Sequence, residues 1–259
     1  MNLMFSTLSE LSLELAIIGV GILIAIFGVI SSVVSVILAI CYLKYNYRKN
    51  SAGLTGVEAA RRILDANGLG YIGVSATGSF IFGNSYSAYF NKVRLRRFTQ
   101  KKKSITSLAM GAQKSALAVL HKEGDADMKK RVRLVPIVTF GPLAFIPLII
   151  LGVVLDIFLF HSNGIATVII AAFGLALLLF SILLSFLMLK TEKKAQVRAY
   201  ALLRENGMAT EYEIEQMKGL FRLYNIQYIN DIIISILELL RFILQIALII
   251  ARNSGRVKK

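Results

Sequence analysis

The chain lacks several residue types on which many enzymes and secreted proteins depend. Its 259 residues include no tryptophan, one cysteine, two histidines and three prolines. A single cysteine excludes a disulfide framework, and its position in an apolar run gives no sign of a thiol nucleophile. The two histidines, His121 and His161, support no Ser-His-Asp arrangement, and neither a Walker loop nor a G-x-G-x-x-G motif occurs. Common nucleotide-binding and serine hydrolase functions are therefore excluded.

Acidic residues are also scarce, while apolar residues are abundant. The chain carries 15 Asp and Glu against 30 Lys and Arg, and 56% of its residues are hydrophobic. The apolar residues gather in long runs, which is typical of an integral membrane protein. These runs occupy residues 16–43, 135–160, 165–189 and 231–251.

The first three runs predict membrane-spanning helices. Residues 16–43 contain no charge, and a bilayer core needs only about 20 apolar residues. All three prolines lie in 135–160, so this helix should be kinked. Only four residues separate it from 165–189, which predicts a tight antiparallel hairpin. The sequence indicates a mainly α integral membrane protein with three or four transmembrane helices.

The fourth run carries a polar stripe. Asp231, Glu238, Arg241 and Gln245 are spaced to share one helical face. Glu238 and Arg241 are three residues apart, so we expect them to pair. The helix could pack by this stripe or use it as an ion path or docking seam. It could span the bilayer or lie re-entrant at the inner interface; its length and apolar content favour spanning.

Basic residues near the apolar runs predict orientation and domain organisation. Residues 44–134 hold 18 Lys and Arg against five Asp and Glu, which indicates the cytoplasmic side. The N-terminus should then lie outside, and 190–229 inside. The expected divisions are an N-terminal transmembrane helix, a basic cytoplasmic region, a helical hairpin, cytoplasmic helices, and a C-terminal apolar helix with a basic tail. They occupy residues 1–43, 44–134, 135–189, 190–229 and 230–259.

Local signals give the soluble parts an α/β character. Thr55 and Glu58 form a capping-box pattern at a helix start, and Thr210 and Glu213 form a second one. Asn206-Gly207 should break the helical segment 195–222. Short strands are predicted at 71–75, 79–83 and 92–95, and a core helix at 105–121.

The basic balance suggests a contact surface. We expect it to attract the anionic inner leaflet of the membrane, where each basic residue near the surface contributes about 1 kcal/mol. An acidic protein, or RNA such as a ribosome surface, is the alternative partner. The residues are Lys92, Arg94, Arg96, Arg97, Lys101, Lys102, Lys103, Lys129, Lys130 and Arg131.

Two stretches resemble the YugP-type membrane zinc metallopeptidases. Residues 49–69 read KNSAGLTGVEAARRILDANGL, close to a run that follows the first membrane helix in that family. Residues 107–124 read SLAMGAQKSALAVLHKEG and are similar to its metal-binding helix. Val93-Arg94-Leu95 also matches, whereas residues 84–88 keep only Tyr86 of a family D-H-Y-D-P motif. After the third apolar run, Glu192 matches the third zinc ligand of the family.

The resemblance implies a zincin-like α/β insertion on the cytoplasmic side of a bacterial cell membrane. It also implies a lost metal site, because Gln113 and Leu117 stand where the family has histidines and Lys114 where it has glutamate. Leu117 offers no ligand atom, Gln113 is a poor ligand, and an ammonium repels zinc. Glu192 alone cannot hold the metal, so no cofactor is expected.

The hypothesis that follows is a catalytically inactive, metallopeptidase-like protein rather than an enzyme. It would act as an accessory or scaffold subunit, with other membrane proteins, including an active family relative, as candidate partners. Two alternatives remain: an active membrane zinc protease with a rebuilt metal site, and a transporter or channel component that uses the polar stripe.

Overall fold

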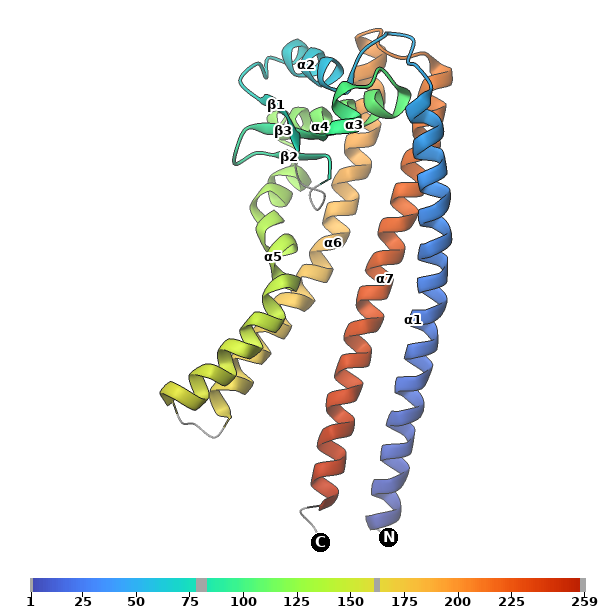
Figure 1. Cartoon of the computed structure of the whole chain (residues 1–259). Helices are drawn as coiled ribbons and strands as arrows, with labels where there is room; N and C mark the ends of the chain where they lie inside the picture. Colours follow the sequence, from blue (N-terminus) through green and yellow to red (C-terminus); the bar gives the residue numbers. More distant parts are fainter. Residues whose placement is uncertain (1, 78–82, 161–163, 257–259) are drawn as a thin grey trace. The chain divides into compact units, whose positions relative to one another are not determined.

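A computed structural model describes residues 2–77, 83–160 and 164–256 (Figure 1). The helices are α1 (Asn2–Tyr47), α2 (Gly56–Ala66), α3 (Arg97–Lys101), α4 (Ile105–Lys122), α5 (Ala126–Leu155), α6 (Ile165–Glu205) and α7 (Glu211–Arg256). The strands are β1 (Gly73–Thr77), β2 (Ser85–Ser87) and β3 (Lys92–Arg96), and a π-helical turn, Asp156–Phe160, follows α5. The expected mainly α membrane protein is confirmed.

Four helices are long and apolar enough to cross a membrane: Glu10–Tyr47, Ala126–Leu159, Ile165–Glu205 and Glu211–Arg252. Two of them extend well beyond their apolar runs. Helix α6 continues from the third run to Glu205, and α7 begins at Glu211, before the fourth run. The helices therefore pass without interruption through the divisions expected at residues 189 and 229. The predicted break is confirmed at Asn206, which caps α6, and Gly207, whose φ is +60°.

The chain forms two compact units, one of Met1–Leu38 with Ile226–Lys259 and one of Ala39–Asn225. In the first unit, α1 and α7 lie antiparallel along a polar seam. Asn230 Nδ2 donates to the Phe27 carbonyl at 3.1 Å, and Gln227 Nε2 donates to Ser31 Oγ at 2.7 Å. Near the two termini, Arg252 and Glu14 form an ion pair at 2.5 Å. Because buried polar groups need partners, these bonds specify how the two helices align.

The four residues of the predicted polar stripe on α7 do not share one environment. Asp231 joins the seam, since its carboxylate accepts from Gln227 at 2.9 Å. Glu238, Arg241 and Gln245 are exposed. The ion pair expected between Glu238 and Arg241 is wrong: both residues are described, and no such pair forms. The two side chains extend separately from the helix surface.

In the second unit, a three-stranded sheet has the order β1-β3-β2, with β3 parallel to β1 and antiparallel to β2. Val93 and Leu95 of the central strand are fully buried. The first and third expected strands are confirmed to within two residues. The second, 79–83, falls almost wholly outside the described residues, and β2 lies just after it. This α/β region matches the expected class, while its zincin-like character stays a prediction.

Helices α2 and α4 cross at two glycines. Thr55 and Glu58 cap α2 reciprocally, as predicted: Glu58 N donates to Thr55 Oγ1 at 3.2 Å and Thr55 N donates to Glu58 Oε2 at 2.7 Å. The backbone bond from Thr55 holds the pKa of Glu58 below its usual range. A Cβ on Gly111 of α4 would collide with the Gly56 carbonyl. The helices therefore approach backbone to backbone.

Helices α5 and α6 form the predicted hairpin. Gly141, Gly152 and Gly174 allow it, because a Cβ on any of them would press on the opposite helix. Helix α5 continues through its three prolines but is not straight (Figure 1). At the turn end, Asp156 is buried and accepts from Thr167 Oγ1 at 3.0 Å. His161 lies outside the described residues.

Gly111→Ala should destabilise the protein by about 1–3 kcal/mol, because the new methyl group has no space beside the Gly56 carbonyl. Gly219→Ala in α7 is the matched control: nothing lies within 4 Å of its added Cβ. That change should be neutral or stabilise by up to about 1 kcal/mol. Thermal unfolding in detergent measures both, and equal effects would contradict the close crossing.

Candidate functional site

The helix predicted at residues 105–121 is confirmed as α4. Helix α4 begins after Ser104, whose Oγ accepts from Ser107 N at 3.1 Å as an N-cap. Its side chains from Ile105 to Val119 are all buried. Gln113 and Lys114, which stand at metal-site positions, are 5% and 9% exposed, and Leu117 is 1% exposed. Leu117 therefore fills core space, as expected for a residue with no ligand atom.

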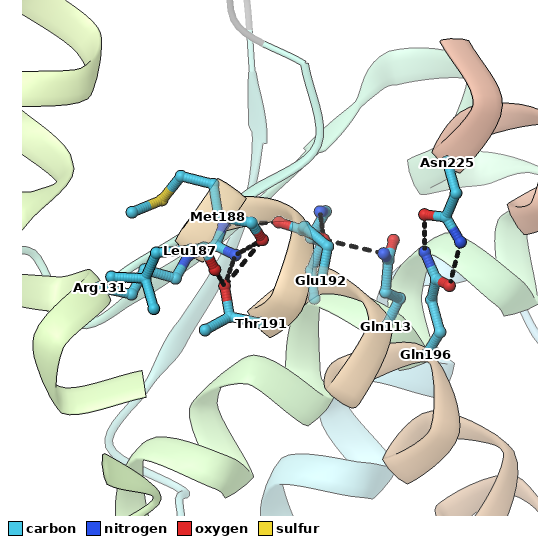
Figure 2. Close-up of polar contacts among 9 residues, drawn as sticks. Gln113, Arg131, Leu187, Met188, Thr191, Glu192, Gln196 and Asn225 are labelled. Atoms are coloured by element: carbon cyan, nitrogen blue, oxygen red, sulfur yellow. Dashed lines mark hydrogen bonds and ion pairs between the residues drawn. The ribbon is translucent and has the colours of Figure 1, made fainter. Parts of the chain in front are cut away.

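Gln113 and Lys114 meet Glu192, the one retained ligand position, which lies on α6. Gln113 Nε2 and Lys114 Nζ both donate to Glu192 Oε2, each at 2.8 Å. Figure 2 shows the Gln113 amide directed at the Glu192 carboxylate. Positions 79 residues apart in the sequence thus converge on one oxygen atom. This convergence is what the family resemblance implied for these positions.

Arg131 of α5 completes the cluster, a role that its position in a basic stretch did not predict. Its Nη2 atom lies 2.5 Å from Glu192 Oε1, and its Nη1 atom donates to Thr191 Oγ1 at 2.7 Å (Figure 2). The residue was predicted to be part of a lipid- or partner-facing basic patch. Only 14% of its side chain is exposed. The packing of α5 on α6 turns Arg131 towards Glu192. We call Gln113, Lys114, Arg131 and Glu192 the Glu192 cluster.

The charges of the Glu192 cluster do not fit a zinc ion. A catalytic zinc site needs three protein ligands and an open position. Here one carboxylate is the only good ligand, and both of its oxygens already accept from cations or an amide. The ammonium of Lys114 would repel a metal ion beside Glu192 Oε2. In the described ranges, no group of three His, Cys, Asp or Glu side chains could hold a metal ion.

Two further charge clusters surround this position. Lys194 Nζ lies 2.7 Å from Asp125 Oδ2 and 2.6 Å from Asp127 Oδ2, and Lys190 pairs with Asp127 at 2.9 Å. The hydrogen bond from Lys194 holds the pKa of Asp125 below its usual range. Lys194 departs from the family pattern, and its charge joins the start of α5 to α6. The remaining cluster pairs Arg198 with an acid at each end: Glu123 at 2.8 Å and Glu205 at 3.1 Å.

Tyr86 and His121, which both match family positions, contact each other. The Tyr86 hydroxyl lies 3.1 Å from His121 Nδ1, which joins β2 to the last turn of α4. Burial raises the pKa of Tyr86 to about 12, so the phenol keeps its proton near neutral pH. The His121 side chain is half-buried. The pair is a structural link, because neither residue contacts the Glu192 cluster.

Two more polar contacts were not predicted. Gln196 and Asn225 exchange two amide hydrogen bonds, both 2.9 Å, between α6 and α7 (Figure 2). Glu213 caps α7 as its motif predicted and also accepts from Ser51 N and Ser51 Oγ at 2.7 and 2.6 Å. Ser51 lies in the segment 49–69, which resembles the family. One acid therefore supports both a helix start and that loop.

The predicted basic patch divides into exposed and engaged residues. Lys92, Arg96, Arg97, Lys101, Lys103, Lys129 and Lys130 are exposed, Arg94 and Lys102 are partly exposed, and Arg131 lies in the Glu192 cluster. The structure does not test whether the exposed residues bind a partner. It does show exposed aromatic side chains among them, which the sequence did not reveal: Tyr89, Phe90 and Phe98 are 83%, 64% and 69% exposed.

Comparisons with known proteins agree with the resemblance. The sequence profile of the family described as "Putative neutral zinc metallopeptidase" matches residues 20–247. The chain is 27% identical over 203 residues to "Putative membrane protease YugP" of Bacillus subtilis (strain 168), which covers 78% of this chain and 84% of that protein. No solved structure matches.

Glu192→Gln should destabilise the protein by about 3–5 kcal/mol, because it leaves the Lys114 and Arg131 charges without a counter-charge in a poorly solvated place. The matched control is Glu215→Gln, which removes an exposed ion pair to Lys218 and should cost at most about 1 kcal/mol. Thermal or denaturant unfolding in detergent measures the difference. Similar midpoints for the two variants would show that the cluster contributes little to stability.

Proposed function

This chain belongs to the neutral zinc metallopeptidase family, and we propose that it is a membrane-embedded member in which zinc hydrolysis has been replaced by a binding role. The observation that carries the proposal is the Glu192 cluster. Two basic side chains and an amide bind the carboxylate of Glu192, the residue that matches the third zinc ligand of the family. A closed site of this kind needs no open coordination position and no substrate cleft. The protein would serve as an accessory or scaffold subunit of a membrane assembly.

The arrangement of α1 and α7 supports a topology for this role. These helices pair antiparallel from the Asn230 contact to the Glu14–Arg252 ion pair, so the two chain ends lie on one side of their unit. If both helices span, the chain crosses the bilayer four times. The basic excess of residues 44–134 then favours a cytoplasmic position for that region, with both termini outside.

The exposed part of α7 supports a partner within the membrane. Asp231, Glu238 and Arg241 are the charged residues of the run 231–251, and neither Glu238 nor Arg241 forms an ion pair with any residue that the structure describes. A charged side chain at the centre of a transmembrane helix costs about 2.5–3.5 kcal/mol unless it finds a polar partner or water. The apolar runs of α1 and α6, residues 16–43 and 165–189, carry no charge, and Asp156 of the run 135–160 is hydrogen-bonded to Thr167. A polar helix of another subunit would supply the polar partner that these two charges need.

One test of the proposed function measures metal binding. Protein purified in mild detergent, incubated with zinc and desalted, should retain far less than one zinc per chain by elemental analysis. The triple variant Gln113→His, Lys114→Glu, Leu117→His should gain zinc, because it frees Glu192 Oε2 while Arg131 still holds Oε1.

The matched control is the double variant Gln113→His, Leu117→His, which keeps the Lys114 ammonium and should bind zinc more weakly than the triple variant. About one zinc per wild-type chain that survives a weak chelator would overturn the proposal and favour the rebuilt protease site.

Another test of the proposed function measures partner binding. Protein isolated from its native membrane should carry a stoichiometric membrane protein, identified by mass spectrometry. Glu238→Gln with Arg241→Gln should release it, because the polar contacts across the helix face are lost. Glu14→Gln with Arg252→Gln removes the same charges from a pair made within the chain and should retain it. Equal recovery with both double variants would remove α7 as the docking face.

A further inference from the structure

The short helix α3 and its flanks form a surface that combines unpaired basic charge with exposed aromatic rings. We call it the α3 surface; its residues are Tyr47, Arg97, Phe98, Lys101, Lys102 and Lys103. Phe98 is 69% exposed and Tyr47 is 78% exposed. Arg97, Lys101 and Lys103 are exposed, and Lys102 Nζ lies 4.7 Å from the centre of the Tyr47 ring. The surface thus presents rings and cations together.

The charges of the α3 surface form no direct ion pairs with the described residues, although Lys103 lies within electrostatic range of Glu58. None of its four basic side chains forms an ion pair with any described residue. The sequence contains no Asp or Glu between Asp65 and Glu123. Basic side chains elsewhere in the unit, such as Lys194, instead have acidic neighbours. The α3 surface is therefore available to an external anion.

The hydrogen bonds of α1 join this surface to the end of an apolar run. That run of α1 ends at Leu43. The Tyr42 hydroxyl lies 3.3 Å from Thr99 Oγ1 of α3, and the Tyr42 carbonyl accepts from Thr106 Oγ1 at 3.2 Å. A bilayer boundary at the end of this run would bring the exposed side chains of α3 to the lipid headgroups.

We propose that the α3 surface binds the anionic lipid headgroups of the cytoplasmic leaflet, with Phe98 entering the interface and Arg97 and Lys101 contacting phosphate groups. Aromatic rings favour the headgroup region, where their apolar bodies leave water, and basic residues near an anionic leaflet are attracted to it. This contact would hold the α/β region against the membrane. The proposed lipid contact does not depend on whether the protein binds zinc, because none of the residues of the α3 surface belongs to the Glu192 cluster.

Fluorescence tests the proposal directly, because the chain has no tryptophan. The full-length Phe98→Trp variant is placed in nanodiscs of phosphatidylcholine alone or of phosphatidylcholine with phosphatidylglycerol. With phosphatidylglycerol, its emission should shift to shorter wavelength and be quenched by brominated acyl chains. Both effects should be weaker in neutral discs. Tyr47→Trp serves as a second reporter if Phe98→Trp does not fold.

The control reporter is Tyr71→Trp, at a residue that is 68% exposed, lies between α2 and β1 and is not part of the α3 surface. Its emission should be the same in both discs. If Phe98→Trp and Tyr47→Trp behave like this control, the α3 surface does not meet lipid, and an acidic protein or RNA becomes the occupant to consider. Equal quenching in neutral and anionic discs would overturn the anionic recognition.

Charge variants complete the test. Arg97→Gln with Lys101→Gln should abolish most of the phosphatidylglycerol-dependent shift in the Phe98→Trp background. Arg62→Gln with Arg222→Gln removes the same charge from exposed positions outside the α3 surface and should leave the shift unchanged. An equal loss in both double variants would indicate a response to net charge alone and overturn the proposed site.

Discussion

The Glu192 carboxylate is the point on which the second unit depends. It is largely shielded from water, so its charge must be balanced by protein groups. Helix α4 supplies an ammonium and an amide, and α5 supplies a guanidinium. Three successive helices, α4, α5 and α6, are thereby joined at one anion. In a zinc enzyme of the family a metal ion would join them; here the chain's own cations perform that structural part.

The parts of the structure that could be predicted from the sequence are those set by local chemistry. Apolar run length predicts the spanning helices, and the pairs Thr55–Glu58 and Thr210–Glu213 predict the helix starts, because each pair satisfies free N–H groups within one turn. The positions Gln113, Lys114 and Glu192 were also identified as one site, through the family resemblance. Their chemistry followed from residue type alone.

The contacts that could not be predicted depend on how separate helices face one another. Arg131 belonged, in sequence, to a run of basic residues like any near a membrane. Only the packing of α5 on α6 turns it towards Glu192. The pair Gln196–Asn225 and the polar seam between α1 and α7 arise in the same way. The expected Glu238–Arg241 contact failed for the opposite reason: correct spacing permits a pair but does not require it.

Glu192 Oε2 accepts one hydrogen bond from the Gln113 amide and one from the Lys114 ammonium. This arrangement affects how the site could change during evolution. A histidine at position 113 alone would lose the amide bond and still face the lysine charge. Replacement of Lys114 alone would leave the carboxylate with one remaining cation and no metal ligand beside it. Each single step towards the H-E-x-x-H motif of the resemblance would give up an existing bond before zinc could compensate. Loss of the metal in such a lineage would therefore be difficult to reverse through single substitutions, and the protein would be preserved or lost according to what it binds.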